Sequence, residues 1–357
     1  MASLRWKAIS QAEKKYTGVT MTYVEPIIYY VALLFIMMVP GIIMKKCSMT
    51  SETFGKGISK LVLYIAQPSL VFLAYVRDFD KDILLNSVYV LILSVIIHTL
   101  FSIVALSCFK KAPDNARRML RFTTIFANAA FMGIPLIREV LEPTFPGATM
   151  YASIYNITFN LFLWSLGVYI CTDDRDEDGD GVTDGDIATD YHEVRRKKSL
   201  TAGILKALLH PVTIAAALGL LFFILPINRY MPKLVLESLS MLQALVAPLS
   251  MLVIGLRLAD MSFEGILKDR HMFLFLALRH IMLPAAVILI IKLLCLIGVN
   301  IPEVVSLVCV ILASAPAASS ATMFAEQYDC DARYVSRAVA ISTIISIITM
   351  PLMIMLV

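Results

Sequence analysis

Two short clusters of polar and small residues, each built around a proline, interrupt otherwise apolar stretches of the chain. A proline inside a helix removes one backbone donor and clashes with the preceding turn, which leaves amide and carbonyl groups without partners. The helix that resumes after the proline carries positive partial charge at its first turn. Two such ends that converge would therefore bind an anion, and we expect a small carboxylate. The clusters are Asn128, Gly133 and Pro135, and then Ser314, Pro316, Ser319 and Ser320.

Other polar side chains inside apolar stretches could extend this site. Gln67 directly precedes a proline and Asn160 lies one helical turn after Asn156, so they are predicted to line a substrate cavity. The alternative for these side chains, for Asn128 and for the serines is a hydrogen bond between helices. Ionisable groups inside a membrane are functional by default, so three of them are predicted to line a polar path. These are His98, Arg279 and His280.

The interval 173–193 is strongly acidic and holds alternate aspartates followed by a glycine. This spacing matches a calcium-binding loop, in which alternate carboxylates wrap a hard cation. Ile187 stands where such a loop has its bidentate glutamate, and no pair of flanking helices is evident. We therefore favour a solvated acidic linker over a Ca2+ site. The candidate calcium ligands are Asp176, Asp178, Asp180 and Asp184.

The elements that must position these residues are membrane-spanning helices. Of 357 residues, 59% are hydrophobic and only 16% are charged, and the mean hydropathy is +0.79. This balance excludes an ordinary soluble enzyme, a disordered chain and a nucleic-acid binder. The apolar stretches contain no aspartate for an intramembrane protease, and the chain has no zinc-type, P-loop or nucleophile-elbow motif. We expect no enzymatic activity and no bound cofactor.

Ten apolar stretches approach the roughly 20 residues that a helix needs to cross a bilayer. They form two sets of five, and nearly the same number of residues separates Pro68 from Pro135 in the first set as Pro248 from Pro316 in the second. An odd number of spans gives the second set the opposite orientation, so we expect an inverted repeat. The stretches are Pro26–Met44, Leu61–Val76, Ile83–Phe109, Leu120–Leu141, Ala148–Ile170, Ile204–Leu225, Leu234–Leu258, Met272–Val299, Val304–Ala325 and Val335–Val357.

The sequence thus predicts an all-α polytopic membrane protein of ten transmembrane helices in two inverted five-helix repeats, in which the proline-broken helices four and nine cross. The expected organisation is an N-terminal tail at 1–23, the first repeat at 24–170, an acidic then basic linker at 171–200, and the second repeat at 201–357. Loops after the odd-numbered helices hold seventeen lysines and arginines against five on the other side. That side is therefore predicted to be cytoplasmic and to include the acidic linker, with both termini outside.

The stretches 126–136 (FANAAFMGIPL) and 313–322 (ASAPAASSAT) resemble the auxin efflux carrier family of membrane transporters. That family includes plant carriers and bacterial permeases for small organic acids, and it is similar to the bile acid/sodium symporters. The resemblance, from about Tyr23 to Val357, implies that helices one, two, six and seven form a scaffold beside a mobile transport domain. It places Asn128, Pro135 and Pro316 at the crossover. Serines stand in the second stretch where plant carriers have asparagine, which argues against auxin itself as the substrate.

We therefore expect a secondary transporter of small organic anions in the cell membrane. It would work by elevator-type alternating access, with the anion bound where helices four and nine cross. The alternative is a ligand-sensing membrane receptor that keeps the transporter fold and is regulated through the acidic linker. The sequence leaves open whether H+ or Na+ is the coupling ion. Membrane lipids and a second copy of the chain are the other expected partners.

Overall fold

The computed structural model describes residues 25–51, 53–172, 203–225, 227, 230–259, 269–328 and 330–357, and the regular elements in these ranges are helices. This confirms the predicted all-α membrane fold class. Seven helical runs are long and apolar enough to cross a membrane, and α11 (Pro211–Ile224) and α16 (Glu303–Ser314) are shorter apolar helices. The seven runs are Glu25–Lys46, Phe54–Tyr75, Lys81–Ser107, Ala148–Thr172, Lys233–Ala259, Arg270–Leu296 and Ala332–Ile354.

Most of the long runs combine several segments, some of them π-helical (η), in which the turn is wider than in an α-helix. In chain order the remaining labelled segments are α2 (Val39–Lys46), α3 (Phe54–Leu61), η1 (Val62–Ala66), α4 (Gln67–Tyr75), α5 (Lys81–Ser107), α6 (Asp114–Ile125), η2 (Ala129–Gly133), α7 (Ile134–Val140), α8 (Ala148–Phe162), η3 (Leu163–Gly167), α9 (Val168–Thr172), α12 (Lys233–Ala244), α13 (Val246–Ala259), α14 (Arg270–Ala277), η6 (Leu278–Met282), α15 (Leu283–Leu296), α17 (Ala321–Gln327) and α18 (Ala332–Ile354).

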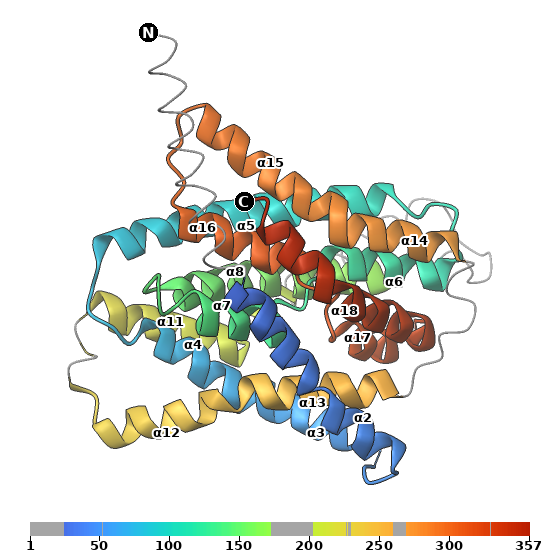
Figure 1. The fold of residues 1–357 in the computed structure, drawn as a ribbon, viewed down its shortest axis with the longest axis horizontal. Coiled ribbons are helices and arrows are strands. Elements are labelled where there is room, and N and C mark those ends of the chain that lie inside the picture. The colour runs from blue at the N-terminus through green and yellow to red at the C-terminus, as the bar shows by residue number, and fades with distance from the viewer. Residues whose placement is uncertain are drawn as a thin grey trace, which may run out of the picture.

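Helices far apart in the sequence pack against one another. Helix α2 packs on α13, and α4 packs on α11. Gly41 of α2 and Gly255 of α13 bring two backbones into direct contact, because a Cβ added at Gly255 would lie only 2.0 Å from the carbonyl oxygen of Met38. Figure 1 shows α12 and α13 along one edge of the molecule and α14 and α15 along the opposite edge, with α7 and α8 between them.

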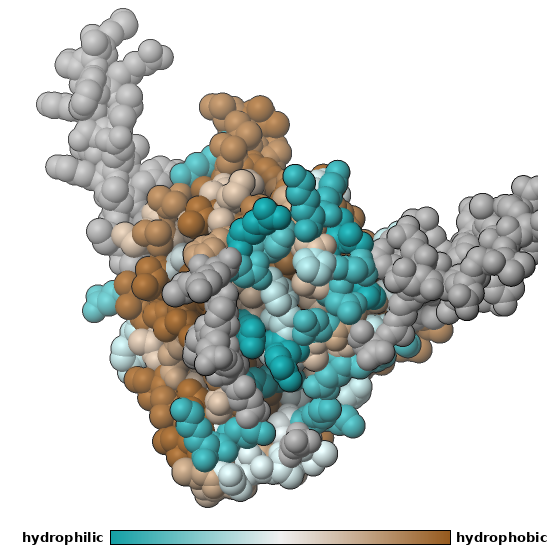
Figure 2. All heavy atoms as spheres, turned by 90° about the vertical axis from the view of Figure 1, so that its right-hand side faces the viewer, coloured by the Kyte–Doolittle hydropathy of each residue, from teal (hydrophilic) through white to brown (hydrophobic). Residues whose placement is uncertain are grey.

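The outer surface of the long helices is apolar. Exposed large side chains include Ile92 and Ile103 of α5, Leu289 of α15 and Ile348 of α18. Figure 2 shows hydrophilic residues gathered on one end of the bundle and hydrophobic residues along its side. A contiguous apolar surface of this kind suits contact with lipid rather than water.

Candidate functional site

The two predicted broken helices are interrupted next to each other. Helix α6 ends at Ile125, and the helical run resumes at Ala129. Helix α16 ends at Ser314, and α17 begins at Ala321. Ala315 has an extended backbone (ψ 149°), as expected for a residue that precedes a proline. Pro316 therefore marks the second break as the sequence predicted.

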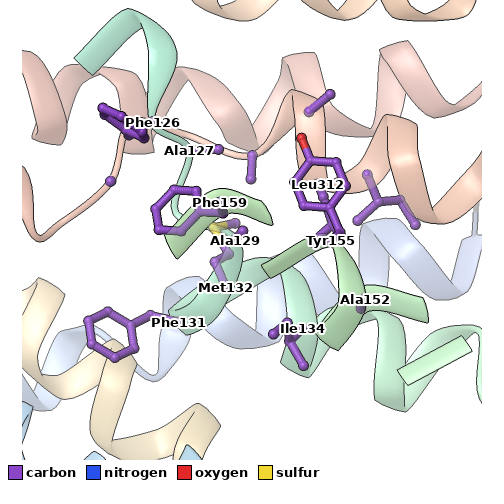
Figure 3. Close-up of a cluster of buried hydrophobic side chains, with 14 of the residues drawn as sticks. Phe126, Ala127, Ala129, Phe131, Met132, Ile134, Ala152, Tyr155, Phe159 and Leu312 are labelled. Atoms are coloured by element: carbon purple, nitrogen blue, oxygen red, sulfur yellow. The ribbon is translucent and has the colours of Figure 1, made fainter. Parts of the chain in front are cut away.

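Backbone hydrogen bonds join the two interruptions. The amide of Asn128 donates to the carbonyl of Pro316 at 2.7 Å, and the amide of Ala318 donates to the carbonyl of Phe126 at 2.8 Å. These bonds make Ala127 and Ala317 an isolated antiparallel bridge. Figure 3 shows Phe126 and Ala127 on the unwound segment, with Phe159 and Tyr155 of α8 packed beside the resumed helix. The two helices thus meet through a two-residue piece of sheet.

Pro135 does not break its helix, so the prediction that helix four is interrupted at this proline is wrong. It is the second residue of α7, directly after the π-helical η2. Pro68 and Pro284 occupy the same position after η1 and η6. A proline has no N–H to donate within a helix, and its ring clashes with the carbonyl four residues earlier. A widened turn makes room for the ring. The interruption lies at Phe126–Asn128 instead.

Arg279 lies on one side of the crossover, where it donates hydrogen bonds to both interrupted helices. Its guanidinium donates to the carbonyl of Ala315 (2.6 Å from Nη2 and 3.1 Å from Nε), to Ala313 (2.9 Å) and to Thr124 (3.3 Å). The side chain is fully buried and lies over the ring of Phe101. The carbonyls of Thr124 and Ala313 belong to the last turns of α6 and α16, where the helix dipole is negative, and Ala315 directly follows α16. Arg279 therefore satisfies both interrupted helix ends at once.

His280 and His98 are also held by protein groups. The two ring nitrogens of His280 lie 2.9 Å from Ser342 Oγ and 3.0 Å from Thr349 Oγ1. Ser342 Oγ also accepts from the amide of Ala317 at 2.8 Å, so this network supports the bridge. His98 Nδ1 lies 2.7 Å from the carbonyl of Ser94, and its ring packs against aromatic side chains of α8. None of the three residues predicted for a polar path lines the cavity described next.

A cavity of about 100 Å³ lies on the other side of the crossover. Of the predicted substrate residues, Gln67, Asn128, Asn160, Ser319 and Ser320 line it, together with Asn156. The structure thus brings together these polar side chains from four predicted spans, and most of the remaining wall is apolar. The other lining residues are Leu63, Ala127, Ala130, Phe131, Phe159, Leu163, Trp164, His210, Val212, Arg257, Ala318, Met323, Phe324 and Gln327.

Many polar atoms around this cavity are buried and have no hydrogen-bond partner in the described part of the chain. Buried polar atoms are nearly always bonded, so a group of unbonded ones around one space indicates a place for a ligand or for water. The donors outnumber the acceptors, which suits an anion. The donors are Gln67 Nε2, Asn128 Nδ2, Asn160 Nδ2, Trp164 Nε1 and Ser319 Oγ, and the acceptors are Gln67 Oε1 and Asn156 Oδ1.

The other predicted substrate residues lie outside the cavity. Gly133 faces α16, where an added Cβ would lie 2.5 Å from the side chain of Leu312. Ser314 Oγ donates to the carbonyl of Val310 at 2.7 Å. Pro316 contributes its carbonyl to the bridge, and Pro135 shapes the turn before α7. These four residues build the crossover rather than line the space beside it.

Arg257, like Trp164, is a cavity residue that sequence reasoning missed. It lies near the end of α13, and its Nη1 donates to the carbonyl of Ser319 and to Thr322 Oγ1. The same rule that singled out Arg279, an ionisable group inside an apolar stretch, applies to Arg257. Its position one residue before the predicted end of span seven made it resemble a cation that reaches toward the membrane surface.

A second cavity of about 330 Å³ lies further along α4, lined by Leu70, Arg77, Arg138 and Glu142 among others. Arg77 and Glu142 form an ion pair at 2.6 Å. Glu142 also accepts from the amides of Gly147 and Thr149. Helix α4 therefore borders both cavities, with Gln67 lining one and Leu70 the other.

The predicted calcium ligands Asp176, Asp178, Asp180 and Asp184 lie outside the described residues. Within the described ranges, no three histidine, cysteine, aspartate or glutamate side chains gather where they could hold a metal ion.

Comparison with known proteins assigns the class. The family model described as membrane transport protein matches residues 26–354, so the chain belongs to that family of membrane transporters. This confirms the resemblance to the auxin efflux carriers. The chain is also 21% identical over 326 residues to an uncharacterized transporter of Methanocaldococcus jannaschii, with 90% of this chain and 96% of the relative covered. The crossover and its cavity are therefore features of a multi-pass membrane transport protein.

Proposed function

We propose that the protein is a secondary transporter that binds a small organic anion in the crossover cavity. The observation that carries this proposal is the group of unbonded donors around the cavity, from Gln67, Asn128, Asn160, Trp164 and Ser319. Amide, indole and hydroxyl donors suit carboxylate oxygens, and bonds to a charged group are the stronger ones. The aromatic part of the wall, which includes Phe131 and Phe159, suits an apolar body attached to the carboxylate.

Ten membrane crossings in two inverted repeats are part of this proposal. The packing supports it, because equivalent helices of the two halves make equivalent contacts. Helix α2 of the first half packs on α13 of the second, and α11 of the second packs on α4 of the first. Likewise α18 packs on α6, and α8 packs on α16. In this arrangement α2, α4, α11 and α13 form a scaffold, and the crossover belongs to the other body.

The two cavities support alternating access. Both lie where the scaffold meets the crossover body, one beside Gln67 and Arg257 and the other beside Leu70 and Arg138. A displacement of the crossover body along α4 would carry a bound anion from one space toward the other. We propose that the end with the acidic linker faces the cytoplasm of a cell membrane, in line with the lysine and arginine distribution of the loops.

The test is binding followed by flux. Purified protein in detergent is screened by thermal shift against small mono- and dicarboxylates, because a ligand that binds only the folded state raises the melting temperature. Labelled ligands that bind are then assayed in proteoliposomes for saturable, counterflow-stimulated uptake. Binding without turnover would favour the ligand-sensing receptor, and conductance without saturation would favour a channel. Absence of any carboxylate binding by folded protein would overturn the proposal.

A further inference from the structure

Arg257 shares its origin with Gln67 of α4 but not with most other donors of the cavity. It projects from α13, in the proposed scaffold, whereas Asn128 and Ser319 belong to the crossover segments. Its side chain is partly buried, and Nη1 donates to the carbonyl of Ser319 and to the hydroxyl of Thr322. Arg257 therefore already joins the two bodies across the edge of the cavity.

The charge of Arg257 has no carboxylate partner among the described residues. Among the described residues, no aspartate or glutamate oxygen lies within 4 Å of its guanidinium, and the neighbouring Glu326 on α17 pairs with Lys56 at 2.9 Å. A partly buried cation gains most from an anion in the same low-dielectric space. None of the described residues that line this cavity is an aspartate or a glutamate.

The geometry of the guanidinium leaves one edge for a ligand. Arginine presents five N–H donors in a rigid fork, and Nη1 carries the two hydrogen bonds to Ser319 and Thr322. The edge formed by Nε and Nη2 makes no hydrogen bond to a described residue, and the residue lines the cavity. That edge matches the spacing of two carboxylate oxygens, which arginine binds in a bidentate manner.

We propose that Arg257 is the specificity-determining residue of this cavity: it pairs with the carboxylate of the ligand and excludes uncharged compounds of the same shape. This inference rests on the proposed function and adds the residue that sets charge selectivity. Because Arg257 comes from the scaffold, the bound anion contacts both bodies. The side-chain amides of Asn128 and Asn160 alone would bind an uncharged amide ligand nearly as tightly as a carboxylate ligand.

The test compares benzoate with benzamide, which have nearly the same shape and differ in charge. Binding of both probes is measured by calorimetry on detergent-purified full-length protein. Wild type should bind benzoate at least tenfold more tightly than benzamide. Arg257→Gln should lose about tenfold to a hundredfold in benzoate affinity, as expected when a bond to a charged group is removed, while benzamide affinity changes by less than about threefold. Benzoate preference retained in Arg257→Gln would overturn the inference.

Two controls separate charge selectivity from a structural clamp. Thr322→Val removes one hydrogen bond of Arg257 and keeps its charge, so the preference for benzoate should persist. Arg270→Gln makes the same chemical change at the exposed start of α14 and should behave like wild type. If Thr322→Val and Arg257→Gln lose the preference equally, Arg257 acts as a clamp and the inference fails.

A charge-preserving variant carries the test if Arg257→Gln does not fold. Arg257→Lys keeps a cation but replaces the planar guanidinium with an ammonium, which cannot bind two carboxylate oxygens in a bidentate manner. Its benzoate affinity should fall, but its preference for benzoate over benzamide should persist because the charge remains. Loss of that preference in folded Arg257→Lys would contradict the inference. If wild type binds neither probe, the proposed anion site itself is wrong.

Discussion

Buried polar groups on the two sides of the crossover differ in how fully they are hydrogen-bonded. Behind it, Arg279 makes four hydrogen bonds to backbone carbonyls, and Ser342 bonds both to His280 and to the amide of Ala317 in the bridge. In front of it, Asn128 and Asn160 are equally buried and have donors without partners. Buried polar groups that are fully bonded make a structure rigid, and those left unbonded need a partner from outside the fold. The hydrogen bonds that a buried polar side chain lacks therefore indicate its role better than its position does.

The largest expected effect tests the structural side. Arg279→Met removes the donor for carbonyls at two interrupted helix ends and should lower the free energy of unfolding by at least about 3 kcal/mol, because buried acceptors lose their partners. Thermal unfolding and size-exclusion profiles in detergent measure this loss. Arg257→Gln should fold far better than Arg279→Met. A monodisperse Arg279→Met protein with wild-type melting temperature would contradict the assignment.

The next effect tests the binding side. Asn128→Ala should weaken benzoate binding by about tenfold to a hundredfold, because a donor to a charged ligand is worth about 1.5–3 kcal/mol. Its stability without ligand should stay within about 0.5 kcal/mol of wild type, since the Asn128 Nδ2 makes no bond to the described protein. Asn86→Ala, which removes a 3.2 Å bond to Tyr151 far from the cavity, is the matched control. Equal benzoate affinity in Asn128→Ala and Asn86→Ala would exclude Asn128 from the site.

A smaller effect is expected at Ser342, again behind the crossover. Ser342→Ala leaves the amide of Ala317 without its acceptor and one nitrogen of His280 without its partner, so we expect a loss of about 1–3 kcal/mol in stability. Benzoate affinity, measured on the folded fraction, should change by less than about threefold. A large loss of benzoate affinity at unchanged stability would show that the network of Ser342 and His280 takes part in binding. The two sides of the crossover would then not differ in role.

The smallest effect concerns the surface contact between α3 and α17. The side chains of Lys56 and Glu326 are 60% and 50% exposed, and exposed ion pairs contribute less than about 1 kcal/mol. Glu326→Gln should therefore leave the melting temperature almost unchanged, and raised salt should have the same small effect on wild type. A loss comparable to that of Ser342→Ala would show that this contact, rather than the buried network, holds α17 in place.

Much of the fold could be predicted because the signals are local. Long apolar runs predict helices, and Pro316 predicts an interruption because its ring fixes φ and lacks a donor. The break at Phe126–Asn128 contains no proline, and its cause is tertiary: Arg279 takes the carbonyl of Thr124, and the bridge takes the groups at Phe126 and Asn128. A sequence does not reveal such partners, so the break was predicted at the nearby Pro135 instead.

The candidate site could be predicted only in part. Gln67, which precedes a proline, and Asn160, which lies one turn after Asn156, both line the crossover cavity, and their role in binding a substrate stays a prediction. Arg279 and Arg257 carry the same charge in similar apolar surroundings, and residue type alone does not separate them. Only the packing shows that the Arg279 guanidinium donates to carbonyls at two helix ends, whereas the Arg257 guanidinium borders a cavity. Helix rotation about its own axis decides this, and single-sequence patterns fix that rotation poorly.

The bridge between Ala127 and Ala317 uses backbone atoms alone. Its two hydrogen bonds do not depend on which side chains stand at these positions, provided that they fit the available space. The side chains that border the cavity, by contrast, take no part in holding the two chain segments together. Substitution of those side chains should therefore change the shape and charge of the cavity and leave the backbone junction in place.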